Sequence, residues 1–162
     1  YTTFGKEAID STKLGLYFAD TEPDYQYSTY SLSHGGTNIE IPPGVSDHEM
    51  RASHVFEDEV VLHGLRPHMH YRGKRMRFSV VYPDGTKDQI INVPDYNFAW
   101  QPTYRLSEPM LLPAGSRVMI EGAFDNSQYN LGNPDPAAAV TGGAQSWDEM
   151  FIGYLSYNKT SQ

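Results

Sequence analysis

Glycine and proline divide this chain into short segments rich in β-branched and aromatic residues, and this division limits the folds that the chain can adopt. The 162 residues include 14 glycines and 11 prolines, and no segment between them keeps a long helical period. We therefore predict an all-β fold, an antiparallel β-sandwich of the jelly-roll type. The predicted strands are residues 13–19, 37–41, 52–57, 60–71, 75–82, 87–92, 103–112, 117–125 and 150–157.

Three turn motifs support these strand boundaries. Pro83-Asp84-Gly85-Thr86 separates two alternating segments and predicts a hairpin, and Leu112-Pro113-Ala114-Gly115 and Pro42-Pro43-Gly44 predict further turns. Two stretches do not read as strands. Residues 20–27 contain Pro23 and several acids and predict a connector, and residues 125–147 predict a long loop, a kind of segment that is usually functional or disordered.

Composition excludes several classes of partner and site. The chain carries 12 Lys and Arg against 20 Asp and Glu, a net charge of -8, and has no basic run, so nucleic acid and anionic membranes are not expected partners. It has no cysteine, which excludes disulfides and thiolate ligands. No apolar run approaches the ~20 residues that span a bilayer. The chain starts at Tyr1 rather than methionine and shows no secretory signal at this end, and a processed or truncated product would explain both observations.

The segment His68-Met69-His70 is the strongest candidate for a functional site. Two imidazoles at i and i+2 of a strand project from the same face, about 7 Å apart along the backbone, which allows them to chelate one metal ion. A methionine from a distant strand, such as Met150 after Asp148-Glu149, would complete a nitrogen and thioether site. That donor set favours copper over zinc, calcium or magnesium. The pattern predicts copper chemistry outside the cytoplasm.

Each of these candidate residues also has an ordinary structural role as an alternative. Met150 taken alone would be a core residue, and Asp148 and Glu149 could act as acid and base or orient the ligand histidines, although we expect them to make loop hydrogen bonds. The Asp and Asn residues of 125–135 indicate side-chain-stabilised turns rather than a calcium loop. The remaining histidines are expected to be hydrogen-bonded polar residues: His34, His48, His54 and His63.

Several short motifs follow one another along the chain: Pro67-His68-Met69-His70, Arg72-Gly73-Lys74, Val93-Pro94-Asp95-Tyr96, Leu112-Pro113-Ala114-Gly115, Asp125-Asn126-Ser127, Asn133-Pro134-Asp135-Pro136 and Asp148-Glu149-Met150. In this order and spacing they resemble the C-terminal domain of the copper type II, ascorbate-dependent monooxygenases, and the resemblance covers roughly residues 37–157. The animal members are peptidylglycine α-hydroxylating monooxygenase and dopamine β-monooxygenase, and the Asn-Pro-Asp-Pro loop is more similar to bacterial relatives.

The resemblance implies a two-domain enzyme with one copper centre in each β-sandwich. It implies that the copper of the second domain binds dioxygen and is held by His68, His70 and Met150, while a reductant such as ascorbate supplies electrons through the first domain. Residues 1–5 and 10–16 resemble the end of that first domain. We therefore predict that residues 1–24 are a domain remnant plus linker and that residues 25–162 form the copper-binding domain. The implied location is extracytoplasmic, periplasmic or secreted.

The resemblance also suggests a substrate pocket. In the peptidylglycine enzyme an arginine, an asparagine and a tyrosine near the copper ligands anchor the substrate carboxylate. Arg66 and Tyr154 occupy two of these positions, but Ile152 replaces the asparagine, which argues against a peptide-carboxylate substrate. The ordinary alternative for Arg66 is an ion pair with a neighbouring acid on the sheet.

Two functions from different classes are compatible with the sequence. In the first, the domain is the oxygen-activating half of a copper monooxygenase that hydroxylates a C–H bond of a small molecule, and it is incomplete without the electron-transfer copper domain. In the second, it is a non-catalytic extracytoplasmic β-sandwich, fused to or assembled with other subunits, that retains or has lost its copper.

Overall fold

The structure is a computed structural model that describes residues 5–23, 26–33 and 38–160. Within these residues it is all-β and contains no helix, as predicted. No helix long and apolar enough to cross a membrane occurs in this described part of the chain. The strands are β1 (Ser28–Ser33), β2 (Glu40–Ile41), β3 (His48–Val55), β4 (Val60–His68), β5 (Gly73–Val81), β6 (Lys87–Val93), β7 (Tyr104–Leu112), β8 (Arg117–Phe124), β9 (Val140–Thr141) and β10 (Ile152–Lys159).

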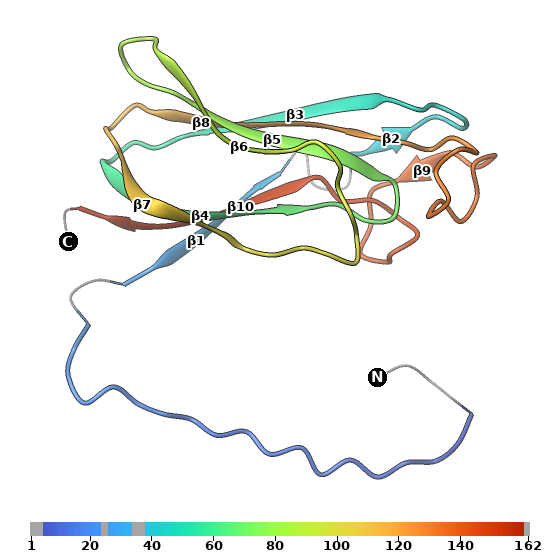
Figure 1. The fold of residues 1–162 in the computed structure, drawn as a ribbon, viewed down its shortest axis with the longest axis horizontal. Helices are drawn as coiled ribbons and strands as arrows, with labels where there is room; N and C mark the ends of the chain where they lie inside the picture. Colours follow the sequence, from blue (N-terminus) through green and yellow to red (C-terminus); the bar gives the residue numbers. More distant parts are fainter. Residues whose placement is uncertain (1–4, 24–25, 34–37, 161–162) are drawn as a thin grey trace.

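Two four-stranded antiparallel sheets form the two layers of a β-sandwich (Figure 1). Sheet I has the strand order β1-β10-β4-β7, and sheet II has the order β3-β8-β5-β6. The short strands β2 and β9 pair separately at one end of the sandwich. The predicted antiparallel β-sandwich is confirmed.

The core lies between the inner faces of the two sheets. Leu62 and Leu65 of β4 and Phe78 and Ile120 of sheet II are fully buried, and burying each such side chain contributes about 1.5–3 kcal/mol. The sheets approach closely at Gly153 of β10, where an added Cβ would lie 2.6 Å from Phe78 Cε1 and 2.7 Å from Ile120 Cγ2. A side chain at position 153 would therefore push the two layers apart.

The predicted turns are confirmed. Gly85, in the hairpin between β5 and β6, has φ 86° and donates its N–H to Tyr82 O at 2.9 Å. Gly115, between β7 and β8, has φ 87°, and Gly44 has φ 71°. Glycine adopts this left-handed region without the steric penalty that a Cβ imposes, so these three positions allow the chain to turn after the preceding strand.

Some strand predictions were wrong. Residues 13–19 form no strand and are exposed, because no neighbouring strand satisfies their backbone. The first strand is instead β1, which follows the predicted connector, was not predicted as a strand, and pairs with β10. The long loop contains the short strand β9, and strand 52–57 begins earlier, as β3. Thr37, in the predicted strand 37–41, lies outside the described residues, and only Glu40–Ile41 of that strand form β2.

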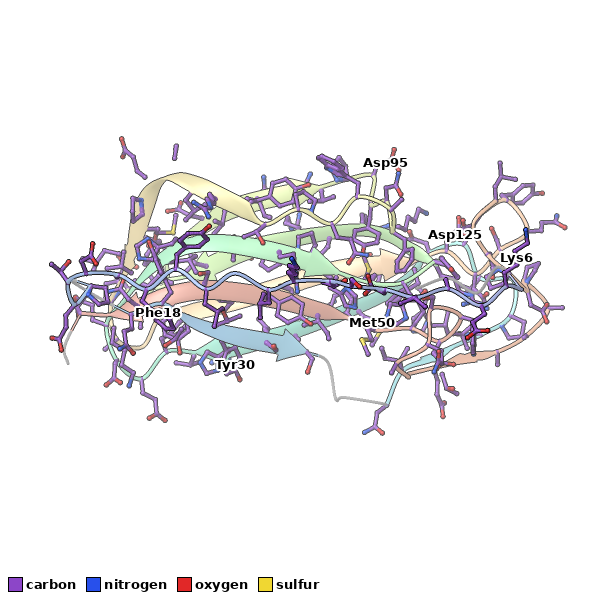
Figure 2. The ribbon with its side chains drawn as sticks, turned by 90° about the horizontal axis from the view of Figure 1, so that it is seen from below. Lys6, Phe18, Tyr30, Met50, Asp95 and Asp125 are labelled. Carbon is purple, nitrogen blue, oxygen red and sulfur yellow. The ribbon has the colours of Figure 1, made fainter. Side chains whose placement is uncertain are left out.

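Residues 5–23 run as an extended segment outside the sandwich (Figure 1 and Figure 2). Phe18, labelled in Figure 2, is 85% exposed, and Tyr17 is fully exposed. The division into a domain remnant and a main domain stays a prediction; residues 1–4 and 24 of the predicted remnant lie outside the described residues.

Candidate metal centre

His68 is the last residue of β4, and His70 lies in the turn that leads to β5. Their ring centroids are 5.2 Å apart and their planes are nearly perpendicular. Met69 between them is fully buried and points into the core, as the alternation of a strand requires. The structure thus brings the two predicted histidines together on one side of the backbone.

Both imidazoles are held through the same ring atom. His68 Nδ1 lies 2.6 Å from Gln101 Oε1, and His70 Nδ1 lies 3.1 Å from the backbone oxygen of Asp148. Gln101 Nε2 donates to Phe98 O at 2.7 Å, which leaves Oε1 of that amide facing His68 as an acceptor. Since both partners are acceptors, each Nδ1 carries the proton, and each Nε2 of the neutral ring keeps a lone pair.

Burial lowers the pKa of His68, and the neighbouring positive charge of Arg66 acts in the same direction. The hydrogen bond with Gln101 opposes this shift. A lowered pKa keeps the ring neutral near pH 7, which is the form that binds metal ions.

Glu149 connects the histidine segment to the methionine. Its carboxylate is completely buried and accepts backbone N–H groups from His70 and Arg72, both at 2.7 Å, and from Met150 at 3.3 Å. Continuing the register in which Ile152 pairs with His68 also places Met150 opposite His70. The expectation that Glu149 makes loop hydrogen bonds is confirmed, and these bonds join the two segments that carry the predicted ligands.

Glu149 is an unusual buried acid. Burial raises its pKa to about 7, while the backbone hydrogen bonds and the positive charge of Arg72 oppose the rise. Arg72 is itself 2% exposed and donates to Asn126 Oδ1 at 2.9 Å and to Trp147 O at 2.8 Å. These contacts attach the long loop to the turn that holds His70.

The same loop is built from turns that side chains stabilise, as predicted. Asp125 Oδ1 accepts the N–H of Ser127 at 2.9 Å, and Asn130 Oδ1 accepts that of Gly132 at 2.9 Å. Asp135 Oδ1 accepts the N–H of Ala137 at 2.9 Å. The polar residues of this loop therefore have a structural role of the Asx-turn type.

Tyr96 was not singled out as a site residue by sequence reasoning. Its hydroxyl donates to Met69 O at 2.6 Å and accepts the N–H of Met69 at 2.9 Å, so it holds the backbone between the two histidines. Burial raises the pKa of Tyr96 to about 12. Gly73 makes room for this ring, because an added Cβ would lie 2.6 Å from Tyr96 Cδ1. The sequence signal that could have identified Tyr96 was its place in the Val93-Pro94-Asp95-Tyr96 motif, one of those that carry the family resemblance.

Arg66 and Tyr154 face each other across β4 and β10. They are direct partners in the register, and the guanidinium carbon lies 4.3 Å from the tyrosine ring centroid, a cation–π contact. The Tyr154 ring is 6.2 Å from the His68 ring. Among the residues that the structure describes, no carboxylate forms an ion pair with Arg66, so this alternative role has no support there.

No group of three or more His, Asp or Glu side chains arranged to hold a metal occurs within the described ranges. The predicted ligand set of His68, His70 and Met150 is not a group of this kind, because its third donor is the thioether sulfur of a methionine. Of the other histidines, His63 Nε2 lies 2.5 Å from Asn158 Oδ1 and His54 stacks on Tyr30 at 4.0 Å, whereas His34 lies outside the described residues.

The fold and the site define an all-β sandwich with a candidate metal centre, in which two imidazoles are each hydrogen-bonded through Nδ1 beside the segment that carries Met150. The family model of the copper type II ascorbate-dependent monooxygenase C-terminal domain matches residues 29–162. The chain therefore belongs to this family, and the resemblance predicted from its motifs is confirmed.

Comparison with whole proteins adds little to this assignment. No curated protein matches the chain. Among solved structures, a chain from the structure of the infectious bursal disease virus Gx strain is similar over 85% of this chain and 33% of its own length, with 10% identity and a TM-score of 0.36. A similarity of that level carries no argument about function.

Proposed function

We propose that this chain is the copper-binding, oxygen-activating domain of a monooxygenase that hydroxylates a C–H bond of a small molecule. His68 and His70 would hold the metal through Nε2, and Met150 would add its sulfur. Copper held by these residues supplies the redox chemistry that activates dioxygen, with electrons from an external reductant such as ascorbate.

The observation that carries the proposal is the common orientation of the two histidines. Each Nδ1 is occupied by an acceptor, Gln101 Oε1 or Asp148 O, so each ring offers Nε2. Histidines that bind metals almost always donate their other N–H to a carboxylate, a carbonyl or water, which sets the tautomer and the ring orientation. The donor set also matches copper, since imidazole suits both oxidation states and a thioether suits the reduced one.

The surrounding residues have separate tasks. Glu149 holds the backbone of His70 against that of Met150, and Tyr96 holds the backbone of Met69. Arg66, oriented by the Tyr154 ring, offers a guanidinium next to His68 that would position an anionic group of the substrate.

The complete reaction needs a partner. The family name describes a C-terminal domain, which supports a preceding copper domain as the source of electrons. We place the protein outside the cytoplasm, in the periplasm or secreted, on the strength of the family resemblance. The alternative function, a non-catalytic sandwich that retains or has lost copper, makes a different prediction for the full-length protein.

Copper binding is tested by metal analysis of the full-length protein after copper loading and dialysis. We expect His68→Ala and His70→Ala each to lose one equivalent of copper, while His48→Ala, on β3 of the other sheet, retains it. In X-ray absorption spectra of the reduced protein, Met150→Leu should remove a copper–sulfur contribution. Full copper retention in both histidine variants would refute the site.

Catalysis is tested separately. Full-length, copper-loaded protein with ascorbate should consume oxygen in proportion to hydroxylated product, and His68→Ala should abolish this coupling. A protein that binds copper at these residues but forms no coupled product over a broad substrate screen would support the non-catalytic alternative.

A further inference from the structure

Two adjacent hollows lie on the outer face of sheet I. One, of about 270 Å³, is lined by residues that include Arg66 and Tyr154, and the other, of about 340 Å³, by residues that include Tyr27 and Arg105. They share three lining residues, Gly64, Thr103 and Ser156, so they form one groove. We call this the β4–β7 groove.

The strand register puts the polar side chains of the groove on one face. Arg66 pairs with Tyr154, and Gly64 pairs with Ser156 on one side and with Arg105 on the other. Direct partners point to the same face of a sheet, and so do residues i and i+2 of one strand. His68, Arg66 and Gly64 therefore form a row, and the groove leads away from the candidate metal centre.

The register also gives the spacing of the two arginines. Arg105 lies beside Gly64, two residues from Arg66 and one strand across, so the two Cα atoms are about 8 Å apart at the usual rise and strand spacing. Gly64 places no side chain between them, and the position is closely packed, since an added Cβ would lie 3.0 Å from Tyr104 O and 3.5 Å from Thr103 Cγ2.

Arg66 and Arg105 differ in their partners from Arg75 and Arg77 of sheet II. On sheet II, Arg75 pairs with Glu49 at 3.0 Å and Arg77 with Glu121 at 2.8 Å. No carboxylate within the described ranges pairs with Arg66 or Arg105. In a chain with a net charge of -8, two guanidinium groups without acid partners along one groove favour an anionic ligand.

We propose that Arg105 is a second anion subsite and that the β4–β7 groove binds an elongated small dicarboxylic acid. One carboxylate would meet Arg66, close to His68, and the other Arg105, with the connecting chain over Gly64. Guanidinium matches carboxylate through paired hydrogen bonds, and phosphate shares this chemistry. The inference rests on the proposed function for its reaction, whereas ligand binding itself requires no copper.

Calorimetry on the copper-free full-length protein tests the subsite, with α,ω-dicarboxylates of four to eight carbons and monocarboxylates of the same length. We expect the best dicarboxylate to bind at least 10-fold more tightly than its monocarboxylate, an advantage typical of one added charged hydrogen-bonding group. R105Q should abolish this advantage and leave monocarboxylate binding unchanged. R66Q should weaken both ligands. Comparing the affinity of the dicarboxylate with that of a phosphonate-carboxylate of matched length distinguishes a carboxylate ligand from a phosphate ligand.

Arg77 provides the matched control, because it lies on the other sheet and carries the same charge. R77Q should leave the affinities for both ligands unchanged. R105K should retain part of the tighter binding of the dicarboxylate relative to the monocarboxylate. Equal binding of mono- and dicarboxylates, or equal losses in R105Q and R77Q, would overturn the proposal. Copper binding that fails while dicarboxylate binding persists would count against the proposed function only.

Discussion

The buried carboxylate of Glu149 accepts the backbone N–H of His70 at 2.7 Å. This contact joins residues that are 79 positions apart in the chain. With the bonds from Arg72 and Met150, it makes one acid the common support of the turn after β4 and of the segment before β10. The relative position of the predicted ligands thus depends on a residue that need not touch the metal.

Replacement of Glu149 should therefore affect both stability and copper binding. Glu149→Gln puts an amide NH₂ against backbone N–H donors, and leaving such groups unsatisfied costs about 1–3 kcal/mol each. We expect the free energy of unfolding to fall by about 2 kcal/mol in urea titrations, with weaker copper binding. Glu108→Gln, on an exposed position of β7, is the control and should change neither quantity. An unchanged stability in Glu149→Gln would contradict this role.

Gln101 should control copper affinity with little effect on stability. Gln101→Leu removes the acceptor for His68 Nδ1, so the ring can turn or change tautomer. Loss of such a supporting partner typically lowers metal affinity by about 10–100-fold. Competition with a chromophoric Cu(I) chelator measures this change, and Gln89→Leu, on the exposed part of β6, provides the comparison. Equal affinities in the two variants would show that His68 is oriented by other contacts.

The close packing of the sheets should make Gly153 intolerant of a side chain. In Gly153→Ala the new methyl would meet Phe78 and Ile120 at less than 3 Å, and overpacking of this kind costs about 1–3 kcal/mol. Thermal unfolding should therefore begin at a lower temperature. Gly15→Ala is the matched change in the exposed segment, where the nearest atom would lie 3.7 Å away. A Gly153→Ala protein as stable as Gly15→Ala would show that the layers can separate without cost.

An ion-pair cluster on sheet II gives a pH-dependent prediction. Hydrogen bonds from Arg75 and Lys74 hold the pKa of Asp47 well below its ordinary value of 3.8. Because the folded-state pKa is the lower one, the contribution of Asp47 is present above the unfolded pKa and is lost as pH falls below it. The side chains are 34–42% exposed, so solvent screens the contribution to less than about 1 kcal/mol.

Asp47→Asn tests this sign. The difference in unfolding free energy between the variant and the parent protein should be measurable at pH 7, shrink below pH 4, and fall with added salt. Asp95→Asn, at an exposed position between β6 and β7, is the control and should show no such dependence. A difference that grows at low pH would mean that Asp47 is not stabilised as a carboxylate.

Much of the fold follows from local patterns. Alternation with β-branched residues predicted β4 to β8, and Gly85 and Gly115 marked their turns, because turn chemistry and strand periodicity act over a few residues. Residues 13–19 show the limit of this reasoning. Their pattern also predicted a strand, but a strand forms only where a neighbour pairs with its backbone, and β10 pairs with β1 instead.

The sequence alone determined the all-β class, the family and the two histidines on one face of a strand, because each of these depends on residue type and short-range spacing. Only the tertiary structure decided which ring nitrogen of His68 and His70 is occupied, and that Glu149 and Tyr96 support the site. It also decided that Arg66 and Arg105 share a groove. These relations join residues tens of positions apart, and strand register and packing set them rather than local propensity.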